Sequence, residues 1–181
     1  MLPTTTDLFK NADDWTSAGL VFTDIGGPTF RDLWITPIAG GAPRRLIRDR
    51  FSEYGGEVSP DGRWIAYLSN EAGVDDVYLQ SFPAPGHKTR VSTGGANRVW
   101  WMPGSDELCY RTLNGPLMGA RLTRQGDEIE VAEPRLVLRF PTGGSGPTRP
   151  TMGGGCSSAC RAPASSAAAR VILDWTALVK R

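Results

Sequence analysis

Few residues in this chain have the types and spacing that catalysis needs. His87 is the only histidine, so a Ser-His-Asp arrangement would have to use it. It follows Ala84-Pro85-Gly86, a turn-forming stretch that predicts an exposed hairpin loop. The segment Gly143-Gly144-Ser145-Gly146-Pro147 ends in proline where a nucleophile elbow requires glycine, and the chain has no P-loop. The sequence therefore predicts no catalytic residues and a protein that is not an enzyme.

Three adjacent pairs of carboxylates are the other candidates for acid–base chemistry. They are Asp75-Asp76, Asp106-Glu107 and Asp127-Glu128. Glycosidase chemistry requires two carboxylates that face each other across a cleft. Neighbours on a strand point to opposite faces, so such pairs do not meet this requirement. We therefore expect these pairs to be solvated ends of hairpins.

The cysteines do not form a metal site or a disulfide framework. Cys109 lies in an apolar strand pattern and is expected to be a small core residue. Cys156 and Cys160 lie in a stretch rich in glycine, serine and alanine. One histidine and this single pair cannot supply four zinc ligands at the usual spacing. No metal and no cofactor are predicted.

The charge pattern limits the classes of partner. The net charge is +1, which predicts no attraction to nucleic acid or to anionic lipid. A small basic cluster is interpreted as a solvated loop face in preference to a phosphate site; it consists of Arg44, Arg45, Arg48 and Arg50. No apolar run approaches the ~18 residues of a membrane span, so no membrane insertion is expected. The first ten residues do not resemble a signal peptide.

The main signal in the sequence is an internal repeat. Val58–Tyr67 and Trp101–Tyr110 lie 43 positions apart, and each enters a proline-containing turn and leaves on an apolar strand that ends in tyrosine. An earlier copy runs from Trp15 to Phe22 with a turn that is shorter by two residues. In Ser59-Pro60-Asp61-Gly62, proline presets φ, aspartate bonds its own downstream backbone and glycine accepts a positive φ. Each copy therefore predicts a strand-turn-strand corner.

Two further elements repeat in the same order. Asp32–Ile38 matches Asp76–Phe82 at an offset of 44, with a weaker third copy at Leu117–Leu122. The last element is found three times, at Pro43–Ile47, Lys88–Val91 and Pro134–Leu138. A period of this length with three to four short strands is the size of one propeller blade. The prediction is an all-β partial β-propeller of about three four-stranded blades, at about 11–50, 51–94 and 95–140.

The tryptophans are interpreted within this repeat. Trp15 and Trp101 recur where a strand enters its turn, and Trp34 lies in the middle of a blade, so packing between blades accounts for them. Trp100 should point away from Trp101, which would expose one of the two rings. An exposed ring is a candidate for stacking on a ligand.

The segment Val58–Glu71 strongly resembles the TolB-like (WD-repeat-like) propeller repeat. Its continuation through Val77–Pro83 and Val91–Gly95 resembles the C-terminal propeller of bacterial serine/threonine protein kinases. Val171–Arg181 resembles the closing strand and tail of such chains. This resemblance implies a non-catalytic recognition or scaffold module, a fragment of a sensor or docking region of a receptor-type kinase, that binds protein, peptide or small ligand at one face of the propeller.

Two features depart from that pattern. Closed propellers typically have about four to eight blades, so three blades leave edge strands open, and a homo-oligomer is expected to cover them. Residues 141–170 are low in complexity, with Met152 as their only large apolar side chain, and are expected to be disordered or the product of a shifted reading frame.

Two other functions stay open from the sequence. One is the propeller portion of a prolyl-oligopeptidase-like hydrolase that lacks its catalytic domain, and the other is a non-functional gene remnant. The expected cellular compartment depends on whether the chain stands alone or is a fragment of a receptor kinase. A stand-alone chain is expected in the cytoplasm, and a fragment of a receptor kinase outside it.

Overall fold

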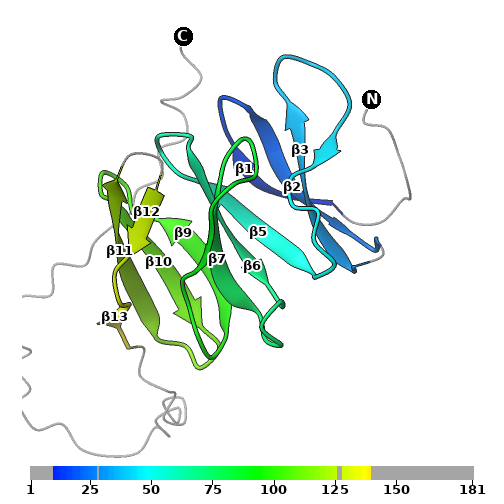
Figure 1. Ribbon diagram of the computed structural model, residues 1–181. Coiled ribbons are helices and arrows are strands. Elements are labelled where there is room, and N and C mark those ends of the chain that lie inside the picture. Colours follow the sequence, from blue (N-terminus) through cyan, green and yellow to red (C-terminus); the bar gives the residue numbers. More distant parts are fainter. Residues whose placement is uncertain (1–9, 28, 126–127, 140–181) are drawn as a thin grey trace, which may run out of the picture. The chain divides into compact units, whose positions relative to one another are not determined.

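The computed structural model describes residues 10–27, 29–125 and 128–139. Within these ranges all regular structure is β-strand, and the strands form three antiparallel sheets that follow one another along the chain (Figure 1). The first sheet has the order β1-β2-β3-β4, with β1 (Lys10–Trp15), β2 (Gly19–Ile25), β3 (Arg31–Pro37) and β4 (Arg44–Arg45).

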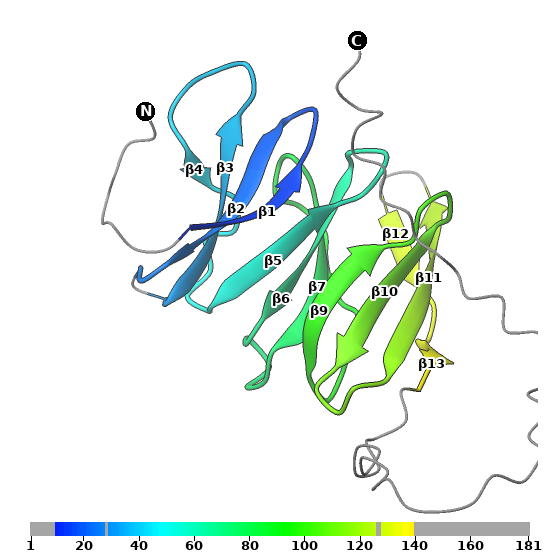
Figure 2. The same cartoon turned by 180° about the vertical axis from the view of Figure 1, so that it is seen from behind.

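The second and third sheets repeat this up-and-down order. The second sheet contains β5 (Glu53–Val58), β6 (Trp64–Ser69), β7 (Asp76–Ser81) and β8 (Lys88–Arg90). The third contains β9 (Ala96–Trp101), β10 (Glu107–Thr112), β11 (Leu117–Gln125) and β12 (Glu128–Val131), and β13 (Arg135–Leu138) also pairs with β11. The view from behind shows the three first strands β1, β5 and β9 beside one another (Figure 2).

The hairpin turns form as the sequence predicts. In the second sheet the Gly62 amide donates to the carbonyl of Ser59 at 2.8 Å, and Gly62 has a φ of +69°. The Ser59 hydroxyl donates to Asp61 Oδ1 at 2.5 Å and accepts from the Trp64 amide at 3.0 Å. Because the turn satisfies its own polar groups, it fixes the register of β5 on β6.

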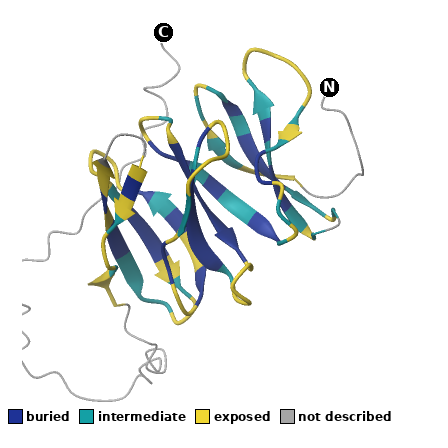
Figure 3. Ribbon diagram, viewed as in Figure 1, coloured by how far each residue is buried: buried dark blue, intermediate teal, exposed yellow. Residues whose placement is uncertain are grey.

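The central strand β6 shows why the sheets stack. Trp64, Ala66 and Leu68 belong to the apolar cluster shared with the third sheet. Ile65 and Tyr67 belong to the cluster shared with the first sheet. Side chains alternate along a strand, so an uninterrupted apolar run requires a neighbour on both faces. All six residues of β6 are buried, as the dark colour of this strand shows (Figure 3).

Two equivalent ion pairs tie the third strand of a sheet to the fourth. Arg45 donates to Asp32 in the first sheet, and Arg90 donates to Asp76 at 2.5 Å in the second. Asp76 is fully buried and also accepts from the Ser92 hydroxyl. The prediction that the Asp75-Asp76 pair is a solvated hairpin end is therefore wrong for Asp76. Alternation along β7 turns this carboxylate inward, where three donors replace water.

The predicted all-β partial propeller is confirmed: the described residues form three sheets of four or five antiparallel strands. The exact repeat boundaries stay a prediction. The expectations for 141–170 and 171–181 lie outside the described residues. In the part of the chain that the structure describes, no helix is long and apolar enough to cross a membrane.

Candidate binding site on the inner strands

The first strands of the three sheets are joined side by side by specific hydrogen bonds. The Val58 amide of β5 donates to Asp14 Oδ2 of β1 at 2.8 Å. The Trp101 indole of β9 donates to the carbonyl oxygen of Glu57 in β5 at 3.0 Å. These bonds hold β1, β5 and β9 as one continuous polar surface.

A pocket of about 420 Å³ opens on this surface. Its volume lies within the range of about 300–1,000 Å³ that is usual for ligand sites. All three first strands contribute to it, and Leu68 of β6 forms part of its wall. The lining residues are Asn11, Ala12, Asp13, Tyr54, Gly55, Glu57, Leu68, Asn97, Arg98 and Val99.

Each of the three first strands carries a β-bulge at the pocket. The register shifts lie between Ala12 and Asp14 in β1, between Tyr54 and Glu57 in β5, and opposite Arg111 and Thr112 in β9. A bulge inserts one residue without a ladder partner and turns its side chain out of the alternation. In β1 that residue is Asp13. Its Oδ2 accepts from the Thr23 hydroxyl at 2.5 Å, so the carboxylate is held in a defined position.

The pocket contains two carboxyl groups whose pKa values are raised. Burial, with the neighbouring Asp14 and Asp13, raises the pKa of Glu57 to about 7, and Arg98 opposes this shift. Burial also raises the pKa of Asp13, against the hydrogen bond from Thr23. Near neutral pH the Glu57 carboxylate and the Arg98 guanidinium thus present opposite charges to the same space.

Several polar side chains of the pocket are free to bind a ligand. Among the described residues, Asn11, Asn97 and Arg98 have no side-chain hydrogen bond or ion pair, and all three are exposed. Tyr54 is already engaged, because its hydroxyl donates to Asp75 Oδ2 at 2.8 Å. Burial and this bond raise the pKa of Tyr54 to about 12. The arrangement offers amide, guanidinium and carboxylate groups on a rigid strand framework, which suits binding of a polar ligand.

Comparison with known proteins identifies the architecture. A solved structure of "putative TolB from Agrobacterium tumefaciens" is similar to the chain, with a TM-score of 0.53 and 18% sequence identity. The match covers 70% of this chain and 50% of that one, so the chain spans half the length of this structural relative. The three sheets are blades of a TolB-like β-propeller fold. No protein-family model and no curated protein matches the sequence.

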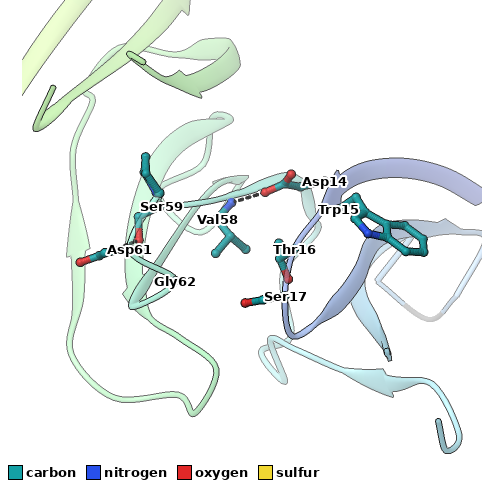
Figure 4. Close-up of a pocket in the computed structure, with 9 residues that line it drawn as sticks. Asp14, Trp15, Thr16, Ser17, Val58, Ser59, Asp61 and Gly62 are labelled. Atoms are coloured by element: carbon teal, nitrogen blue, oxygen red, sulfur yellow. Dashed lines mark hydrogen bonds between the residues drawn. The ribbon is translucent and has the colours of Figure 1, made fainter. Parts of the chain in front are cut away.

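A second pocket, of about 360 Å³, lies between the turns of the first two blades (Figure 4). Two of its hydroxyl groups form hydrogen bonds within the turns themselves. Thr16 Oγ1 accepts from the Gly19 amide at 3.2 Å, and the Ser59 hydroxyl donates to Asp61. Because the hydroxyls of Thr16 and Ser59 are already paired within the turns, we regard this pocket as part of the blade scaffold. The candidate site is the pocket on β1, β5 and β9, which we call the inner-strand pocket.

One tryptophan of the blades, Trp15, behaves differently from the prediction. Trp101 is buried, as expected for packing between blades, and Trp100 beside it is half-buried. Trp15 was expected to pack in the same way, but 69% of its surface is exposed and its ring points away from Val58 (Figure 4). The physical reason is that Trp15 faces the side of the first blade on which the described residues place no other blade.

The other singled-out residues are dispersed over the blades. His87 is exposed, with its ring nitrogen 2.8 Å from the Thr89 hydroxyl, and Cys109 is a buried core residue, both as predicted. In the basic cluster, Arg44, Arg48 and Arg50 are exposed, whereas Arg45 is held by Asp32. No described group of three or more histidines, cysteines or carboxylates is arranged to hold a metal ion.

The described residues of the remaining carboxylate pairs do not line the pocket. Asp106 is exposed and pairs with Arg124 at 2.9 Å. Its neighbour Glu107 is half-buried and pairs with Arg135 at 2.6 Å, so this residue is less solvated than predicted. Glu128 is exposed, and Asp127 lies outside the described residues.

None of the pocket residues was predicted from the sequence to bind a ligand. Asn11, Tyr54 and Asn97 are separated by 43 positions each, so they occupy equivalent places in the three blades. Polar residues at a repeated position of a first strand were therefore a usable signal. What the repeat did not show is that bulges and blade stacking bring them to one pocket.

Proposed function

We propose that this chain is a non-catalytic recognition module that binds a polar peptide segment in the inner-strand pocket. The observation that carries this proposal is the convergence of free amide and guanidinium groups with the carboxylates of Asp13 and Glu57 on three adjacent strands. Among the described residues that line the pocket, none is a serine, threonine, cysteine, histidine or lysine that would act as an activated nucleophile or base beside a carboxylate. Binding is the chemistry for which these groups are suited.

The electrostatics favour a peptide with one cationic side chain. An ammonium group placed between Glu57 and Asp13 would favour their ionised forms and form charge-assisted hydrogen bonds. The carboxamides of Asn11 and Asn97 offer donors and acceptors to the peptide backbone. The guanidinium of Arg98 would donate hydrogen bonds to a carbonyl or carboxylate oxygen of the same ligand. The site therefore distinguishes peptides by charge more than by apolar bulk.

NMR titration tests this proposal. The probes are the capped tripeptides acetyl-Gly-Lys-Gly-amide and acetyl-Gly-norleucine-Gly-amide, which differ in the ammonium group. We expect the lysine peptide to shift the side-chain amide signals of Asn11 and Asn97, and Glu57→Gln to weaken this effect about tenfold. Glu128→Gln, an exposed change on β12, is the matched control. Equal shifts with both peptides, or none with either, would exclude the proposal.

The association with a bacterial receptor-type kinase is also part of the proposal. It is supported by the resemblance of Val58–Glu71 and its continuation to kinase-linked propeller repeats. Sequencing of the gene and its flanks tests it. An open frame that joins a kinase domain and a membrane span to these blades is the expected result. A stop codon and a separate promoter upstream of the first codon would contradict it.

A further inference from the structure

The exposed apolar side chains are concentrated on the two outer blades. The first blade and its loops contribute Trp15, Phe30 and Ile38, and the third contributes Met102, Leu113, Leu136, Val137 and Leu138. The middle blade and its loops contribute one, Val74. The middle blade has a neighbour on each face, and each outer blade has one within the described residues. Exposed apolar side chains are thus more frequent on the two blades that have a neighbour on only one face among the described residues.

The repeat identifies the uncovered side of the first blade. Trp15, Val58 and Trp101 are the last residues of β1, β5 and β9. Val58 and Trp101 are buried against the preceding blade, with exposures of 8% each, whereas Trp15 is 69% exposed. We call the surface formed by Trp15, Leu20, Phe22 and Trp34 the open face. Its members correspond to the residues by which the second and third blades pack on their predecessors.

Trp15 is the exposed part of the open face, at 69%, whereas Phe22 behind it is only 6% exposed. Phe22 and Trp34 stack on each other with ring centroids 6.5 Å apart, which makes a flat aromatic surface. The indole Nε1 of Trp34 is shielded from water and has no hydrogen-bond partner among the described residues.

The third blade presents a matching surface on its other side. Trp100 occupies in β9 the place that Glu57 occupies in β5, 43 positions earlier. In the existing interface the carbonyl of Glu57 accepts from the indole of Trp101. On the same outer side, Val137 of β13 lies over Gly119, where an added Cβ would approach Val137 to 2.9 Å. The outer side of the third blade thus combines a backbone acceptor with exposed aliphatic groups.

We propose that the open face of one copy docks on the outer side of the third blade of a second copy, head to tail. Trp15 then donates to the carbonyl of the partner's Trp100, and the aromatic surface covers the partner's Val137. This repeats the contact that Trp101 makes with Glu57 inside the chain. Two copies joined in both directions bring together six blades, within the range of about four to eight in closed propellers. Closure covers the open face of the first blade and the outer side of the third blade in each copy.

Light scattering after size-exclusion chromatography tests this proposal with the full chain. The expected mass is about 39 kDa, twice the 19.5 kDa of one chain. Trp15→Arg and Val137→Asp should each give monomers, because each removes both contacts of a symmetric pair. Val74→Asp, an exposed apolar residue of the middle blade, is the matched control and should leave the mass unchanged.

Mixing the two variants distinguishes the docking mode. A head-to-tail pair of one Trp15→Arg copy and one Val137→Asp copy keeps one intact contact, so the mixture should regain dimer. A dimer made by two open faces would not be rescued, and that result would overturn the head-to-tail proposal. A monomeric wild type at the highest soluble concentration would also overturn it. Thermal melts show whether each variant is folded. The two substitutions lie on separate surfaces, so the comparison with the wild-type mass can still be made with one variant if the other does not fold.

Discussion

The indole Nε1 of Trp101 donates to the carbonyl oxygen of Glu57 at 3.0 Å, and this bond joins the third blade to the second. Trp101→Phe keeps the aromatic bulk and removes the donor. We expect the free energy of unfolding to fall by about 1–2 kcal/mol, because the carbonyl loses its partner inside the interface. Urea unfolding measures the change. Trp100→Phe, on the half-buried neighbour, should cost about 0.5 kcal/mol or less, and equal losses would show that the bond is not stabilising.

Asp76 is the buried acceptor of the second blade. Asp76→Asn should cost about 3 kcal/mol, because the amide nitrogen would face the Arg90 guanidinium or the Ser92 and Gly95 donors. Chemical denaturation at pH 7 is the measurement. Asp106→Asn, whose side chain is 60% exposed, should change stability by no more than about 0.5 kcal/mol. If Asp76→Asn also lowers the free energy of unfolding by no more than about 0.5 kcal/mol, the ion pair of Asp76 contributes little to stability.

Glu53 should make stability depend on pH. It is fully buried, and neither carboxyl oxygen has a hydrogen-bond partner in the described structure. Burial, Asp49 and Asp32 raise its pKa from 4.5 to about 8. The folded chain therefore holds this proton at pH values where the unfolded chain releases it. The stabilisation is complete below pH 4.5 and is lost as the pH rises toward 8, by at most about 1.4 kcal/mol per pH unit.

Glu53→Gln removes this proton and tests the prediction. The variant should become progressively more stable than the wild type between pH 5 and pH 8, as followed by urea unfolding across that range. For Glu128→Gln, at an exposed position, the free energy of unfolding should depend on pH in the same way as that of the wild type. A constant difference between Glu53→Gln and the wild type would show that Glu53 is ionised in the folded chain.

Binding of the lysine peptide should also depend on pH. The pKa of Glu57 is raised to about 7 by burial and by Asp14, so the carboxylate is lost as the pH falls below 7. We expect the dissociation constant to increase on lowering the pH from 8 to 6, and Glu57→Gln to abolish most of this dependence. Titration calorimetry at three pH values is the measurement. Tight binding at pH 6 by the wild type would exclude a role for the Glu57 charge.

The strands and turns of the blades could be predicted from the sequence because they depend on interactions between residues that are close together in the chain. Ser59-Pro60-Asp61-Gly62 closes its turn with its own hydroxyl, carboxylate and amide groups. The alternation of Trp64 to Leu68 follows from strand geometry alone. A repeat of about 43 residues multiplies these local signals, so the strands and their order could be predicted without knowledge of their neighbours.

The burial of Asp76, the exposure of Trp15 and the inner-strand pocket were decided by the tertiary structure. Each depends on which blade covers a given face, and on bulges that turn single residues such as Asp13 out of the alternation. Trp15 and Trp101 occupy the same place in their repeats, yet one is exposed and the other buried. By itself, the sequence determined the blades and their period. Only the stacking of blades determined which side chains are exposed to solvent, because burial depends on contacts between segments that are distant in the chain.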